Sequence, residues 1–93
     1  MARKTAKFTA SEIGKLPNDK PVLYRILTPS GRPNYVGVAK RGRVQERLKE
    51  HLPGGCDPVP GAKVRVEQTA SIGDAQKKER AVIARNRPKY NKR

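Results

Sequence analysis

Val22-Leu23-Tyr24-Arg25-Ile26-Leu27-Thr28 is a run of mainly β-branched and aliphatic residues, which is typical of a buried strand. Asn34-Tyr35-Val36-Gly37-Val38-Ala39 follows it after a turn that contains Pro and Gly. A short connection of this composition between two apolar runs is a hairpin signal. The two runs therefore predict two antiparallel strands at the start of a small sheet.

Two segments after this hairpin show different hydrophobic periods. Residues 43–52 predict a helix, because apolar side chains recur there at four-residue steps and form one stripe. Residues 62–69 predict a half-exposed strand, because valines alternate there with charged side chains. The positions expected to face the core are Val44, Leu48, Leu52, Val64 and Val66.

The last predicted element is a second helix over residues 74–86, with Asp74 as its N-cap and Pro88 marking its end. Its apolar side consists of Ala75, Val82 and Ile83. The predicted order is β-β-α-β-α. The expected fold class is α/β, with a small three-stranded antiparallel sheet flanked by helices.

Residues 1–20 are interpreted as a basic N-terminal segment that precedes a domain at 21–93. Residues 1–8 are polar and basic without periodicity, which predicts disorder. Thr9 is followed three residues later by Glu12, and this capping-box pattern predicts a short helical turn.

The formal net charge is +14 in 93 residues, and the basic residues are spread over the whole chain. Such a surface attracts polyanions, so nucleic acid is the expected partner. One cysteine and one histidine provide no Cys/His zinc cluster, and there is no P-loop. No apolar run has the length of a membrane span, so we expect no membrane contact and an intracellular location, cytoplasmic or at the nucleoid.

Several residues suited to phosphodiester chemistry lie on these elements. Arg47 and His51 are four residues apart on the first helix and share a face. Glu79 has apolar neighbours on its own helix face, which points its carboxylate toward the core side. The other candidates are Tyr24, Tyr35 and Asn91.

Taken together and in order, these residues resemble the GIY-YIG nucleases, which include phage intron homing endonucleases and excision-repair incision subunits. Val22-Leu23-Tyr24 stands where the family has Gly-Ile-Tyr, and Tyr35-Val36-Gly37 stands where it has Tyr-Ile-Gly. The resemblance covers residues 21–91. It departs from the family pattern at Val22 and Leu23, which replace Gly and Ile.

The resemblance implies a metal-dependent endonuclease that hydrolyses DNA in repair or in a mobile element. Glu79 would bind one divalent ion, Mg²⁺ or Mn²⁺, and Mg²⁺ needs few protein ligands because it keeps several waters. Arg47, with Arg43 as its rival, would hold the phosphate. A tyrosine near positive charge can have its pKa lowered toward use as a base. Of the two tyrosines, Tyr35 is favoured as the base.

The remaining site residues would act around this centre. Tyr24 would assist the base, His51 would donate a hydrogen bond or act as the base itself, and Asn91 would fix the geometry of Glu79 or the phosphate. The residues expected to contact the nucleic acid are Lys40, Arg41, Arg43 and Lys89.

The alternative is a non-catalytic DNA- or RNA-binding module on the same scaffold, such as a ribosomal-type protein. That module would bind nucleic acid in a salt-sensitive way that does not depend on Glu79. If the chain is a nuclease, one active site cuts one strand at a time. A homodimer, or a separate targeting partner, would then supply double-strand cutting or target choice.

Overall fold

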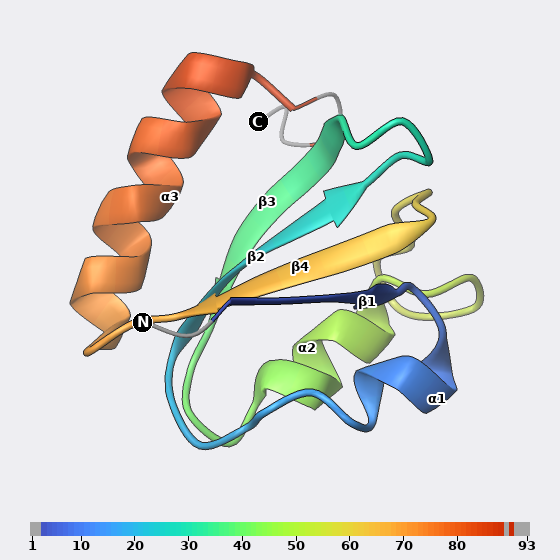
Figure 1. The fold of residues 1–93 in the computed structure, drawn as a ribbon, viewed down its shortest axis with the longest axis horizontal. Helices are drawn as coiled ribbons and strands as arrows, with labels where there is room; N and C mark the ends of the chain where they lie inside the picture. Colours follow the sequence, from blue (N-terminus) through green and yellow to red (C-terminus); the bar gives the residue numbers. More distant parts are fainter. Residues whose placement is uncertain (1–2, 89, 91–93) are drawn as a thin grey trace.

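The computed structural model describes residues 3–88 and 90. Its strands are β1 (Arg3–Lys7), β2 (Val22–Leu27), β3 (Pro33–Ala39) and β4 (Lys63–Gln68). They form one antiparallel sheet in the order β1-β4-β2-β3, with β2 and β4 in the centre (Figure 1). The α/β class and the antiparallel hairpin are confirmed, but the sheet has four strands where three were predicted.

The additional strand is β1, in a segment for which disorder was predicted. Its residues pair with β4 from Arg3 opposite Glu67 to Lys7 opposite Lys63. Backbone hydrogen bonds to the edge of β4 hold it, and these do not require apolar side chains. Ala6 packs against the core, and Phe8, two residues further on, is buried in it. The prediction of disorder is therefore wrong for residues 3–8.

The short turn predicted from Thr9 is present as α1 (Ala10–Ile13). The Thr9 side chain accepts a hydrogen bond from the Glu12 N–H at 3.3 Å, as in an N-cap. Phe8, Ile13 and Leu16 enter the same core as the central strands. These residues before position 20 thus share one core with the domain predicted at residues 21–93.

Two longer helices cover the sheet from opposite sides (Figure 1): α2 (Val44–Glu50) and α3 (Ile72–Asn86). The β2 side chains alternate between the two faces, as expected for a strand. Tyr24 packs in the core that contains the α2 stripe, whereas Leu23 packs with Val82 of α3. Val64 and Val66 are buried as predicted.

The start of α3 lies earlier than predicted. Ser71 is the N-cap, with extended backbone, and its Oγ accepts from the Asp74 N–H at 3.2 Å. Serine and aspartate are both good N-caps, and Asp74 also fits the first helical turn, where a carboxylate interacts favourably with the helix dipole. The prediction of Asp74 as the N-cap is therefore wrong.

The N-terminus of α2 is fixed from outside the helix. The Val44 N–H donates to Asn18 Oδ1 at 2.8 Å, and the Gly42 N–H donates to the Asn18 carbonyl at 2.8 Å. Asn18 thus provides the cap that Arg43, at the N-cap position, does not provide. These contacts anchor the start of α2, the helix that carries Arg47 and ends at His51.

None of the helices in the described part of the chain combines the length and the apolar character needed to cross a membrane.

Candidate active site

Three aromatic rings meet between the sheet and the end of α2. Tyr24 lies opposite Gly37, and Tyr35 lies opposite Ile26, so the two tyrosines are diagonal neighbours on one sheet face. Their ring centroids are 6.2 Å apart. His51, at the C-cap of α2, places its ring 5.7 Å from Tyr24 and 4.8 Å from Tyr35. The structure therefore brings together three residues that lie far apart in the sequence.

A chain of hydrogen bonds connects two of these rings to the backbone. His51 Nδ1 lies 2.9 Å from the Asp57 carbonyl oxygen. Because a carbonyl can only accept, Nδ1 carries the hydrogen, and the neutral ring is left with Nε2 as an acceptor. The Tyr24 hydroxyl lies 2.8 Å from Nε2 and donates to it. The backbone at Asp57 thus sets the tautomer that holds Tyr24 in place.

Tyr24 and His51 are closed off from solvent, with 0% and 1% of their surface exposed, whereas Tyr35 is only partly buried. Burial raises the pKa of Tyr24, and Tyr35 raises it further. Arg47 lowers the pKa of Tyr24, but this effect does not reverse the shift. The hydroxyl of Tyr24 therefore stays protonated, and the choice of Tyr35 as the base remains a prediction.

Gly37 of β3 leaves room for the ring of Tyr24, which lies across it from β2, and for the neighbouring ring of Tyr35. A Cβ atom at this position would be 2.5 Å from the Tyr24 hydroxyl oxygen and 3.0 Å from a ring carbon of Tyr35. Contacts this short are sterically forbidden to a side chain. The glycine of the Tyr35-Val36-Gly37 motif is thus required by the packing of Tyr24 across the strand.

A cleft of about 290 Å³ opens beside the edge strand β3, between α2 and the start of α3. Arg47 lines it and also acts electrostatically on Tyr24, so this arginine connects the cleft with the tyrosine cluster. Lys40 and Arg43, two of the residues expected to contact nucleic acid, line the cleft, whereas Arg41 is exposed and is not among the lining residues.

Glu50 is a member of this site that sequence reasoning missed. Its Oε1 lies 3.2 Å from Nη1 of Arg47, and its charge contributes to the raised pKa of Tyr24. The three-residue spacing from Arg47 on a helix was the available signal. Glu50 thereby orients the guanidinium of Arg47.

Glu79 lies on α3, about one helical turn after a residue that lines the cleft. Ile72 and Gln76 line the cleft, and Glu79 follows Gln76 by three residues on the same helix face. Its carboxylate is half-buried and is close enough to Tyr24 to raise the pKa of that hydroxyl. Burial raises the pKa of Glu79 itself, with Arg80 acting in the opposite direction.

Within the described residues, no group of three or more His, Cys, Asp or Glu side chains forms a metal cluster. The sequence predicts a single protein ligand for the metal ion, the carboxylate of Glu79, and such an oxygen ligand suits Mg²⁺ or Mn²⁺. A half-buried carboxylate that is costly to ionise gains from a hard cation. Lys89 and Asn91, the remaining predicted site residues, lie outside the described residues.

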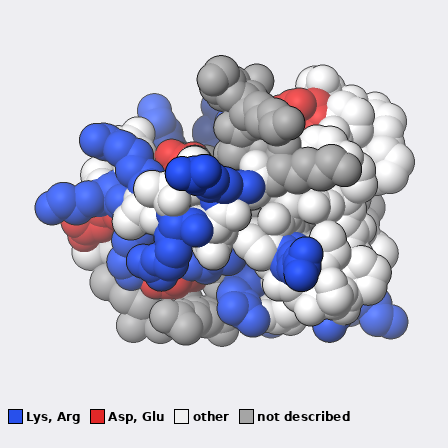
Figure 2. Space-filling view, turned by 90° about the horizontal axis from the view of Figure 1, so that it is seen from above, with Lys and Arg blue, Asp and Glu red and all other residues white. Residues whose placement is uncertain are grey.

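The basic surface is not uniform. Figure 2 shows Lys and Arg side chains gathered on the side of the molecule where α3 lies, while the other side of that view is largely without them. Comparison with known proteins adds no family to this description, since no family model matches the chain and no curated protein matches it.

Proposed function

We propose that this chain is a GIY-YIG-type endonuclease that hydrolyses phosphodiester bonds in DNA with the help of one divalent metal ion. The observation that supports it best is the convergence of Tyr24, Tyr35 and His51 beside Arg47 and Glu79. Such groups can activate a water, hold a phosphate and bind a cation. These five residues come from separate elements of the fold and lie near one another in space, which chance placement along a basic chain would not produce.

In this proposal Tyr35 is the general base. It is the tyrosine of the pair with solvent access, and within residues 3–88 and 90 its hydroxyl has no hydrogen-bond partner. Its oxygen would take the proton of the attacking water. Tyr24 is a positioning residue, because its buried hydroxyl is already committed to His51.

Arg47 holds the scissile phosphate. Its guanidinium offers a planar fork of donors that matches two phosphate oxygens. Lys40 and Arg43 line the same cleft and hold the flanking backbone. Glu50 keeps Arg47 oriented in the free protein, so little ordering remains when DNA binds.

Glu79 would hold the Mg²⁺ or Mn²⁺ ion. When bound, the ion stabilises the negative charge that develops on the phosphate oxygens. Glu79 contributes a partly buried carboxylate that is close enough to Tyr24 to raise the pKa of its hydroxyl.

Replacing Glu79 by Gln is expected to stabilise the metal-free protein near neutral pH. The raised pKa of Glu79 means that ionisation opposes folding, so this cost is absent below its ordinary value of 4.5 and grows as pH rises through the raised pKa. Glutamine removes the cost. Thermal melts in EDTA should show a higher Tm for Glu79→Gln at neutral pH, and the difference should shrink toward pH 4.

The same melts test the metal site without any cleavage. Mg²⁺ or Mn²⁺ should raise the Tm of the wild-type protein and leave that of Glu79→Gln unchanged. Glu46→Gln is a suitable control, because Glu46 is an exposed residue of α2 that is not among the residues lining the cleft. An equal rise in all three proteins would place the cation somewhere other than Glu79.

The direct test of the function is conversion of supercoiled plasmid to the nicked form at low salt. The expected result is nicking in Mg²⁺ and in Mn²⁺ and none in EDTA. The alternative, a non-catalytic binding module, is favoured by one observation, namely the complete burial of Tyr24 and His51. It predicts tight, salt-sensitive binding without cleavage of plasmid, branched or single-stranded DNA under either metal.

A further inference from the structure

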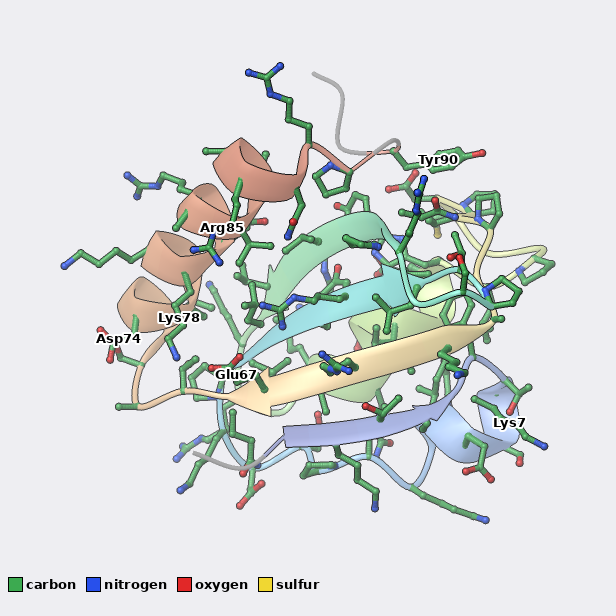
Figure 3. All side chains as sticks on the ribbon, turned by 45° about the horizontal axis from the view of Figure 1, so that its top comes forward. Lys7, Glu67, Asp74, Lys78, Arg85 and Tyr90 are labelled. Atoms are coloured by element: carbon green, nitrogen blue, oxygen red, sulfur yellow. The ribbon has the colours of Figure 1, made fainter. Side chains whose placement is uncertain are left out.

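The sheet face under α3 is only half covered. The helix packs on β3 and β2, and the other two strands, β4 and β1, remain open on that side (Figure 3). By strand alternation, the side chains on this open face are those of every second residue. They include Arg25 of β2, Lys63 and Arg65 of β4, and Lys7 of β1.

This face, which we call the basic sheet face, contains two like-charged cross-strand pairs. Lys7 lies opposite Lys63, and Arg25 lies opposite Arg65. Because positions 63 and 65 are two residues apart, both pairs are on the same side of the sheet. Like charges placed directly opposite each other destabilise a sheet. A bound polyanion would neutralise this repulsion.

Two of the nearby cations are held in fixed positions by a buried carboxylate. Glu67 lies 3.7 Å from Arg25 and 2.6 Å from Lys78 of α3. Figure 3 shows Lys78 and Arg85 extending from α3 toward the sheet, with Glu67 below Lys78. These residues line a groove of about 260 Å³. Cations anchored at the wall of a groove lose less entropy on binding than free surface lysines.

Arg65 is oriented as well. Its Nε donates to Thr5 Oγ1 of β1 at 3.3 Å, so the guanidinium lies across the two open strands. Successive cations on one strand face are about 7 Å apart, comparable to the spacing of phosphates along a nucleic-acid backbone. Guanidinium groups in such a row can bind phosphates through two donors each.

We propose that the basic sheet face binds the phosphate backbone of a second DNA duplex segment, apart from the segment in the cleft. This inference rests on the proposed function only in that the first DNA segment is taken to bind in the cleft. Among the described residues, Tyr90 is the one exposed large hydrophobic side chain, and it is not on β1, β2 or β4. The face therefore has no aromatic platform for unpaired bases and no apolar anchor for a membrane.

The two binding surfaces point in different directions. Tyr24 and Arg25 are adjacent in β2, so their side chains leave the sheet on opposite sides. Along α3, Gln76 borders the cleft while Lys78 and Arg85 border the groove. The proposal therefore assigns a separate duplex segment to each surface.

The test compares two double variants that remove the same charge. Lys63→Gln/Arg65→Gln alters exposed residues of the basic sheet face, and Lys15→Gln/Lys49→Gln alters exposed residues of the α1–α2 layer. Binding of a short fluorescein-labelled DNA duplex is titrated in EDTA at several salt concentrations. The first variant should bind roughly tenfold more weakly, and its slope of log K against log salt should be smaller by about two. The control should bind like the wild type.

A second measurement tests whether the protein binds two duplex segments at the same time. Beads that carry one duplex should retain a second, labelled duplex in the presence of wild-type protein and of the control, but not with Lys63→Gln/Arg65→Gln. Absence of bridging by the wild type, or equal losses in both variants, would overturn the proposal. So would a loss confined to phosphatidylserine vesicles, which would indicate a lipid contact. If the wild type does not nick DNA but Lys63→Gln/Arg65→Gln still lowers the slope of log K against log salt, only the proposed function is contradicted.

Discussion

Tyr35→Phe is expected to lower the rate of plasmid nicking by about a thousandfold, because it removes the oxygen that takes the proton of the attacking water. The ring remains, so its contacts with Tyr24 and His51 persist and the fold should be retained. Single-turnover nicking with excess protein measures the chemical step. Duplex affinity in EDTA should change little, which separates this effect from loss of binding.

Tyr24→Phe is the matched variant for this experiment. It leaves the buried His51 Nε2 without its donor, so the free energy of unfolding should fall by about 1–3 kcal/mol. Its nicking rate, measured well below the Tm, should stay within about tenfold of wild type, since the hydroxyl is closed off from solvent. If Tyr24→Phe abolished nicking and Tyr35→Phe spared it, the assignment of the base would be reversed.

Gly37→Ala is expected to damage both stability and activity. The added methyl group would overlap the Tyr24 hydroxyl and press on the Tyr35 ring, and overpacking of this kind costs about 1–3 kcal/mol. The displaced rings would no longer meet His51 and the cleft correctly, and a misplacement of about 1 Å can cost a hundredfold in rate. Urea unfolding and single-turnover nicking measure the two effects.

Gly73→Ala serves as the control for a generic glycine effect. Gly73 is exposed in the first turn of α3, and the nearest atom to an added Cβ is Ser71 Oγ at 3.8 Å. Alanine there should stabilise the helix by about 0.5–1 kcal/mol and leave nicking unchanged. Equal behaviour of the two variants would contradict the role assigned to Gly37.

Much of the fold could be predicted because hydrophobic periodicity is a local signal. The hairpin of β2 and β3, the stripe of α2 and the alternation in β4 follow from it. The strand β1 could not be predicted in this way, since it is held by backbone pairing with β4 and by Phe8 after it. The N-cap of α3 was misplaced because Ser71 and Asp74 are both capping residues.

The sequence indicates which residues to consider for the candidate site, but not how they are arranged in space. The motifs identified Tyr24, Tyr35 and His51, but the burial of Tyr24 depends on Gly37 beneath it and on α2 above it. The basic sheet face depends on strand register. Lys63 and Arg65 were visible as the exposed half of a strand, but their alignment with Lys7 and Arg25 follows only from the pairing.

The most direct test compares the wild type and Glu79→Gln in one plasmid-nicking time course with Mg²⁺, with duplex affinity measured in EDTA on the same preparations. The account predicts nicking that EDTA stops, slower by about a thousandfold in Glu79→Gln, at unchanged affinity. Nicking at the same rate by both proteins, or tight binding by a wild type that cuts no DNA in Mg²⁺ or Mn²⁺, would contradict it.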